Sequence, residues 1–112
     1  MQDVMQNNRL QISALLDLYG AVLSDRQRDV LQLYYNDDLS LAEIAEDTGI
    51  TRQGVRDAIK KAEKELAEWE SRLGFLAKTA ALRTTAEELV SKAEAGGNDE
   101  VALLARKLLS EI

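Results

Sequence analysis

The sequence predicts an all-α protein built around a helix-turn-helix. Apolar residues recur every three or four positions along most of the chain, which is the spacing of amphipathic helices. The chain contains no proline and few glycines, and such a composition favours helix. Two segments open with Ser followed three residues later by Gln or Glu, the pattern of a helix-capping box. With 112 residues, the chain is the size of one domain with a real core.

The first two helices are predicted from apolar spacing and from the residues at their ends. One helix is expected over about 8–19, with Gly20 as its stop. Its inward positions are Ile12, Leu15, Leu16 and Tyr19. Ser24 and Gln27 then form a capping box for a second helix, which is expected to run to about Tyr35.

A helix-turn-helix is expected from Ser40 onward. Ser40 caps a short third helix that ends near Asp47, and Thr51 caps a fourth helix that has no stop before Gly74. In this motif the two helices cross closely over a short turn. The crossing requires a small residue, a residue that tolerates positive φ, and then an apolar inward face. The sequence supplies them in this order at Ala45, Gly49, Val55 and Ile59.

The outward face of the fourth helix carries the candidate nucleic-acid contacts. They are Thr51, Arg52, Gln53, Arg56 and Lys60. Arg reads guanine through two hydrogen bonds, Gln reads adenine, and Lys or a helix N-terminus binds phosphate. Residues 51–64 carry five basic and two acidic side chains, although the whole chain has a formal charge of −6. The alternative is that these side chains are solvated charges on an ordinary surface helix.

The same helix carries a heptad-like apolar stripe. After Val55 and Ile59 the stripe continues through Ala62, Leu66, Trp69, Leu73 and Leu76. It either packs against helices of its own chain or joins two copies as a homodimer contact. In both cases we expect Trp69 to anchor the contact, because a large aromatic side chain buries the most surface.

The last third of the chain predicts a helical hairpin. Thr84 and Thr85 predict the start of a helix over 85–95, and the run Gly96-Gly97-Asn98 predicts its end. Asp99 is expected to cap the final helix. The inward positions of the two helices are expected to be Leu89, Val90, Ala93, Val101, Leu104, Ala105, Leu108 and Ile112.

The residue types that are missing argue against an enzyme. The chain contains neither cysteine nor histidine, so we predict no catalytic residue, metal site or cofactor. The adjacent Asp37 and Asp38 are expected to form a turn, since two carboxylates alone make a poor cation site. No apolar run approaches the roughly 20 residues of a membrane span. The first residues also lack a signal-peptide pattern, and we expect a cytoplasmic protein without membrane insertion.

One long segment resembles a known family. LSDRQRDVLQLYYNDDLSLAEIAEDTGITRQGVRDAIKKAE is similar to region 4 of bacterial sigma factors and, more closely, to the YlxM family of small helix-turn-helix proteins. The similarity extends over about 8–75. It implies an all-α fold, self-association and a regulatory role in the signal recognition particle pathway. We therefore expect residues 1–75 to form the helix-turn-helix domain and residues 76–112 the C-terminal hairpin, a packing or interaction element.

Two functional hypotheses follow from the sequence. The first is a helix-turn-helix regulator that binds nucleic acid, either DNA or structured RNA, as a homodimer. The second is an acidic adaptor that binds a protein or RNA component of the signal recognition particle instead of DNA.

Overall fold

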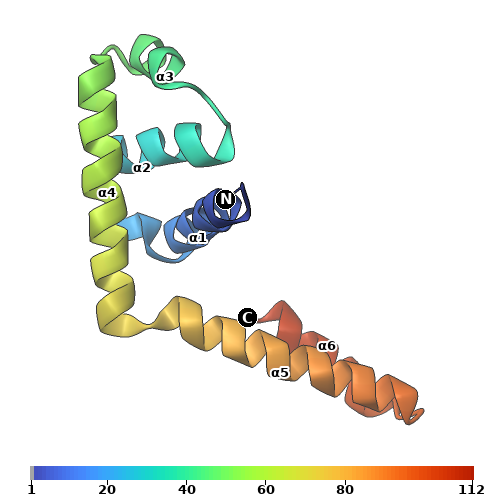
Figure 1. The fold of residues 1–112 in the computed structure, drawn as a ribbon. Coiled ribbons are helices and arrows are strands. Elements are labelled where there is room, and N and C mark those ends of the chain that lie inside the picture. Colours follow the sequence, from blue (N-terminus) through green and yellow to red (C-terminus); the bar gives the residue numbers. More distant parts are fainter. Residues whose placement is uncertain (1) are drawn as a thin grey trace. The chain divides into compact units, whose positions relative to one another are not determined.

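The fold is all-α, as the sequence predicts. The computed structural model describes the backbone of residues 2–112 and the side chains of residues 9–112. This part of the chain forms six α-helices and no strand (Figure 1). The helices are α1 (Gln2–Tyr19), α2 (Asp25–Leu31), α3 (Leu41–Thr48), α4 (Arg52–Leu73), α5 (Phe75–Ala95) and α6 (Asp99–Ser110). They divide into two compact units, Met1–Gly74 and Phe75–Ile112.

The first unit is organised around the long helix α4. Helices α1, α2 and α3 all pack against α4 and lie along one side of it (Figure 1). The core between them is aliphatic, apart from Tyr19, whose hydroxyl donates to Glu70 Oε1 at 2.7 Å and so ties α1 to α4. The buried residues are Ile12, Leu15, Leu16, Tyr19, Leu23, Val30, Leu31, Ile44, Val55, Ile59, Ala62 and Leu66.

Both predicted capping boxes are confirmed. Ser24 accepts from the Gln27 backbone N–H, and the Gln27 side chain accepts from the Ser24 N–H. Ser40 and Glu43 make the same reciprocal pair at the start of α3, with both N···O distances 3.1 Å. Each box satisfies two N–H groups that helix geometry leaves without a partner, and so fixes where the helix begins.

Replacing Ser40 by Ala is expected to lower the free energy of unfolding of the first unit by about 1 kcal/mol, because the cap is lost. The backbone N–H and hydroxyl of Ser40 both bond the Glu43 carboxylate and hold the pKa of Glu43 below its usual 4.5. A lowered folded pKa adds stability above pH 4.5, which is lost as the pH falls through that lowered value. Urea unfolding at neutral and acidic pH should therefore give a smaller difference between wild type and variant at acidic pH.

One predicted boundary in the first unit is wrong, and a second is correct in position but has a different geometry. Helix α1 begins at Gln2 rather than near residue 8, because extending a helix that has already formed costs little. Helix α1 ends at Tyr19, directly before Gly20, as predicted, but Gly20 is not in a left-handed conformation. It is buried and opens a short 3-10 turn over Gly20–Val22, and an added Cβ would meet Leu16 Cδ1 at 3.5 Å. The sequence predicts that the second helix runs to about Tyr35. Helix α2 ends at Leu31, and the helical path continues as a π turn over Gln32–Asn36.

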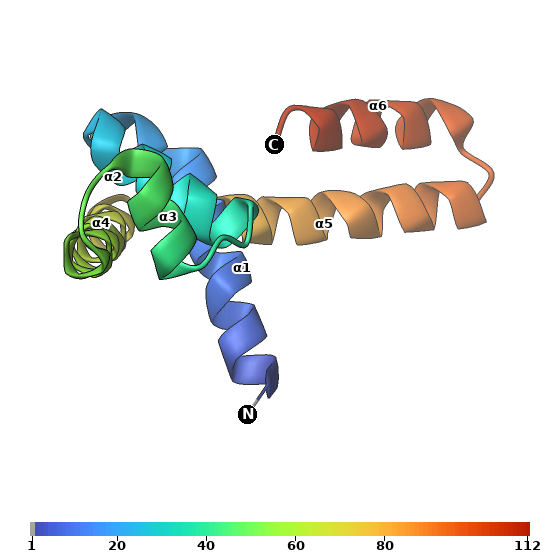
Figure 2. The same ribbon diagram turned by 90° about the horizontal axis from the view of Figure 1, so that it is seen from above.

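The second unit is an antiparallel hairpin of α5 and α6 (Figure 2). The chain reverses at Gly97, whose φ of 72° is left-handed and favours glycine. The residues buried between the helices are Ala86, Ala93, Ala102 and Ala105. Alanine lets two helices approach closely, and the hairpin contact therefore contains no large side chain that is fully buried.

Several predictions for the hairpin need correction. Helix α5 begins at Phe75, not at 85, and the Thr84 hydroxyl donates to the Ala80 carbonyl within the helix instead of capping one. Asn98 rather than Asp99 caps α6, since its side chain accepts from the Val101 N–H at 3.2 Å. The predicted inward leucines are mostly exposed, because the alanine stripe occupies the contact. Leu89, Leu104 and Leu108 have exposed fractions of 44%, 62% and 48%.

Candidate nucleic-acid interface

The turn between α3 and α4 has the geometry that the motif requires. Gly49 adopts a left-handed conformation with φ of 76°, and its N–H donates to the Ala45 carbonyl at 2.9 Å. The Thr48 hydroxyl also donates back to the Ile44 carbonyl, at 2.7 Å. A residue with a Cβ would be strained at Gly49, so this glycine fixes the direction in which α4 begins.

The predicted inward residues hold α3 against α4. Ile44 and Val55 are completely buried, and Ile59 is 7% exposed. Ala45 is half-buried on α3. These contacts position the first half of α4 by packing on both sides of the turn, which leaves the opposite face of α4 uncovered.

The start of α4 is capped as predicted. Thr51 Oγ1 accepts from the Gly54 N–H at 2.9 Å. A Cβ on Gly54 would lie 3.2 Å from this oxygen, so Gly54 is explained by the space that the cap needs. The N–H groups of Arg52 and Gln53 stand in the first turn, where an α-helix provides no partner, and they remain available to an acceptor such as a phosphate oxygen.

The five candidate contact residues are exposed and lie together at the N-cap and on the first three turns of α4. They are Thr51, Arg52, Gln53, Arg56 and Lys60. Within residues 9–112, none of the three cations among them forms an ion pair. Gln53 differs, because its side-chain amide donates to Asp57 Oδ1 at 2.9 Å. It would have to exchange this bond to read a base.

Two arginines elsewhere in the first unit are arranged differently. Arg28 pairs with Asp25 at 2.8 Å, and Arg9 pairs with Asp38 while lying over the rings of Tyr34 and Tyr35. Asp38 has a positive φ of 56° in the predicted turn. No group of three side chains suited to holding a metal exists among the described residues.

A hollow beside Arg56 and Lys60 has a polar contact among the residues that line it. It has a volume of about 370 Å³ and is also lined by Tyr34, Tyr35, Leu41, Ile59 and Glu63. The Tyr35 hydroxyl donates to the Glu63 carboxylate. Burial, and then this carboxylate, raise the pKa of Tyr35 above its usual range, so the hydroxyl remains a donor. The contact joins α4 to the π turn.

The predicted apolar stripe changes character along α4. Leu66 is completely buried within the first unit, whereas Trp69 is half-buried and Leu73 is 45% exposed. Leu76 is not on this helix, because α4 ends at Gly74 and Leu76 belongs to α5. The stripe therefore packs inside the first unit as far as Leu66.

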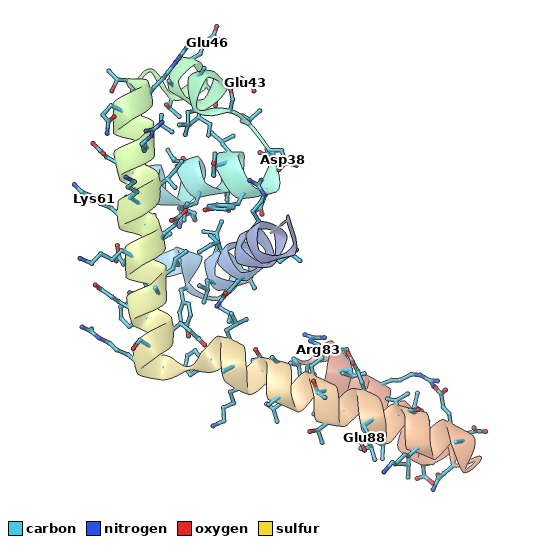
Figure 3. The ribbon with its side chains drawn as sticks, viewed as in Figure 1. Asp38, Glu43, Glu46, Lys61, Arg83 and Glu88 are labelled. Carbon is cyan, nitrogen blue, oxygen red and sulfur yellow. The ribbon has the colours of Figure 1, made fainter. Side chains whose placement is uncertain are left out.

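Trp69 lies in a second hollow that the sequence did not reveal. This hollow has a volume of about 470 Å³, and its lining is Gln27, Lys61, Lys64, Glu65, Glu68, Trp69 and Arg72. Figure 3 shows Lys61 on α4. From the sequence, Lys61 and Lys64 are recognisable only as members of the basic segment 51–64. The hollow depends on the fold, because Gln27 lines it from α2.

Comparison with known proteins identifies a family. Residues 6–103 match the model of UPF0122, described as "Putative helix-turn-helix protein, YlxM / p13 like". The chain is 50% identical over 72 residues to a UPF0122 protein of Clostridium botulinum, a match that covers 64% of this chain and 66% of that one. For a UPF0122 protein of Clostridium kluyveri the values are 52% over 68 residues, with 61% of each chain covered.

A longer match is found in Clostridium perfringens, whose UPF0122 protein is 41% identical over 91 residues, with 81% of each chain covered. The matches to the C. botulinum and C. kluyveri proteins span less than two thirds of those relatives' length. Within its described residues, the chain has no helix long and apolar enough to cross a membrane.

Proposed function

We propose that this chain, which belongs to the UPF0122 family of YlxM/p13-like helix-turn-helix proteins, is a non-enzymatic regulatory protein that binds nucleic acid through the first half of α4. One observation carries the proposal. Arg52, Arg56 and Lys60 are exposed and form no ion pair within residues 9–112, directly after a turn that fixes the direction of the helix. Unpaired cations on a fixed helix N-terminus suit a polyanion.

The proposed contacts divide between phosphates and bases. Phosphate oxygens are bound by the first N–H groups of α4, by Thr51 and by Lys60. These contacts set the position of the helix. Arg52 and Arg56 supply the paired donors that recognise guanine in the major groove. Gln53 can contact a base after its side-chain amide gives up its hydrogen bond to Asp57, which is an exposed residue on the same helix.

The global charge affects how strongly this surface binds. The chain has a formal charge of −6, which opposes the approach of a polyanion. The local excess of basic residues over 51–64 opposes that repulsion only where α4 meets the ligand. We therefore propose that binding weakens steeply as the salt concentration rises. We further propose that the protein acts in the cytoplasm as a homodimer whose DNA half-sites lie about one helical turn apart.

The second candidate is an adaptor in the signal recognition particle pathway that binds structured RNA rather than DNA. The hollow around Trp69 favours it, because an aromatic ring beside Lys61 and Lys64 suits an unpaired base and its phosphate. This site adds to the α4 face and does not depend on a duplex major groove.

One titration separates the two candidates. Wild-type protein is titrated against a labelled mixed-sequence DNA duplex and a labelled RNA hairpin at two salt concentrations, with fluorescence anisotropy as the readout. The regulator hypothesis expects duplex binding that weakens at the higher salt, as counterion release requires. Binding to the RNA hairpin alone supports the adaptor. If the folded protein binds neither nucleic acid at the lower salt, the proposed function is wrong.

A further inference from the structure

The α5–α6 hairpin exposes large apolar side chains that its own contact does not use. The exposed fractions are 51% for Leu82, 44% for Leu89, 62% for Leu104 and 48% for Leu108. Together these four leucines leave uncovered the equivalent of about two complete leucine side chains. Single exposed leucines are ordinary, but a cluster of them on one small unit indicates an interaction surface.

Two polar contacts mark one edge of the hairpin. Arg106 pairs with Glu94, and Arg83 donates to the Ile112 carbonyl at 3.3 Å. Arg83 and Glu94 project from α5, whereas Arg106 projects from α6. Arg83 and Glu94 are eleven residues apart and therefore share one face of α5, and Arg106 reaches Glu94 from α6, so the three side chains lie on the same side of the plane that contains both helix axes. Figure 3 labels Arg83 on α5.

The four leucines lie on the opposite side of that plane. An α-helix turns 100° per residue, which puts Leu104 and Leu108 of α6 about 160° away from Arg106. On α5, the same rotation puts Leu82 and Leu89 on the flank away from Glu94. Because α5 and α6 are antiparallel and side by side (Figure 2), the four side chains form one surface, here called the leucine face.

A covering partner would add to the stability of the hairpin. The unit Phe75–Ile112 has fewer than about 40 residues, so its own core is small. Its internal contact buries alanines, which remove little apolar surface from water. The leucine face carries four of the six exposed large apolar side chains of the hairpin.

A second copy of the same hairpin fits this face. Two leucine faces related by a two-fold axis form a four-helix bundle whose apolar core is flanked by a polar rim, such as Thr85 and the ion-paired Lys92. Residues 75–112 carry five basic and six acidic side chains, so charge repulsion between copies is weak. By contrast, residues 1–74 carry nine basic and fourteen acidic side chains.

We propose that the leucine face binds the leucine face of a second copy, and that this contact, rather than the stripe on α4, holds the homodimer together. The inference rests on the dimer of the proposed function and names its surface. It does not depend on nucleic-acid binding, because the contact is made by the second unit alone.

The test compares three full-length proteins by sedimentation, in the absence of nucleic acid. The first is wild type and the second is Leu82→Gln/Leu104→Gln, which interrupts the leucine face on both helices. The third is Leu73→Gln/Leu103→Gln, a matched control. It replaces two leucines that are 45% and 67% exposed and lie on the α4 stripe and on the Arg106 side of α6. We expect two-chain mass for wild type and control, and one-chain mass for the leucine-face variant.

Three results would overturn the proposal: a monomeric wild type, a leucine-face variant that remains a dimer, or a control that becomes a monomer. If the leucine-face variant is monomeric but has lost helicity by circular dichroism, cross-linking decides. The chain has no cysteine, so Leu104→Cys and Leu103→Cys each provide one attachment point for a bis-maleimide. A covalent dimer from Leu104→Cys alone supports the proposal, and equal or absent products contradict it.

A failure here is distinguishable from a failure of the proposed function. A monomeric wild type that binds duplex DNA would remove the dimer and leave the α4 interface standing. A dimer through the leucine face that binds no nucleic acid would leave this inference standing and remove the proposed function.

Discussion

Ile44→Ala is expected to lower the free energy of unfolding of the first unit by about 2–5 kcal/mol, the range for truncating a buried isoleucine. Ile44 has no exposed surface and lies on α3, which is only eight residues long. A helix this short is not stable without packing. The lost contact therefore loosens α3 from α4 as well as creating a cavity. The same variant should lose affinity for nucleic acid, because the turn no longer fixes the direction of α4.

The chain offers a local probe for this experiment. Trp69 is its single tryptophan and lies on α4, so tryptophan fluorescence during urea unfolding reports on the first unit. Leu10→Ala is the control, since Leu10 is 65% exposed in the same unit and its truncation should change stability by less than about 0.5 kcal/mol. Equal urea midpoints for Ile44→Ala and wild type would contradict the packing described for α3.

Arg52→Ala/Arg56→Ala is expected to weaken duplex binding by about 30-fold or more. Removing an arginine that contacts a base costs about 1–3 kcal/mol of binding free energy. Two losses at the lower end of this range already weaken binding by about 30-fold. Both side chains are exposed, and neither forms an ion pair within residues 9–112. Folding should therefore be unaffected, which circular dichroism checks.

A charge-matched control separates contact from general electrostatics. Lys78→Ala/Lys107→Ala removes the same two positive charges from exposed positions on the hairpin. A general electrostatic effect would weaken duplex binding equally in both variants. Only a direct contact through α4 predicts that the arginine variant loses affinity while the lysine variant stays within a few-fold of wild type.

The helix starts that the sequence predicts well are those that depend on local chemistry. Ser24, Ser40 and Thr51 each satisfy N–H groups within the next three residues, and their hydrogen bonds are as expected. Thr84 carries a similar local signal but lies inside α5. A threonine hydroxyl can donate to a carbonyl one turn back as well as cap a helix, and here the continuous helix from Phe75 prevails.

Which apolar stripe of the hairpin faces inward could not be predicted from spacing. On α5, Ala86 and Ala93 repeat at seven residues, as do Leu82 and Leu89. Both stripes suit a helix contact, and the prediction mixed them by placing Leu89 and Ala93 on the same inward side; of these two residues, only Ala93 is buried. The hairpin instead closes on its alanines, which permit a closer approach, and this choice leaves the leucine face outside.

The candidate interface was predictable in its residues but not in all their interactions. Gly49, Val55 and Ile59 occupy the predicted positions because the short turn permits few alternatives. The bond from Gln53 to Asp57 depends on the rotamers of two exposed side chains, which spacing does not determine. The hollow at Trp69 depends on how α2 crosses α4, and no local pattern encodes that crossing.

The most direct test of the α4 interface is the salt dependence of duplex binding for wild type and Arg52→Ala/Arg56→Ala. Each phosphate contact adds about 0.9 to the slope of log affinity against log salt concentration. If α4 meets DNA through these side chains, the affinity of the variant should be lower at every salt concentration while its slope stays close to that of wild type, because Arg52 and Arg56 are assigned to bases rather than to phosphates. Superimposable lines for the two proteins would contradict a nucleic-acid interface on α4.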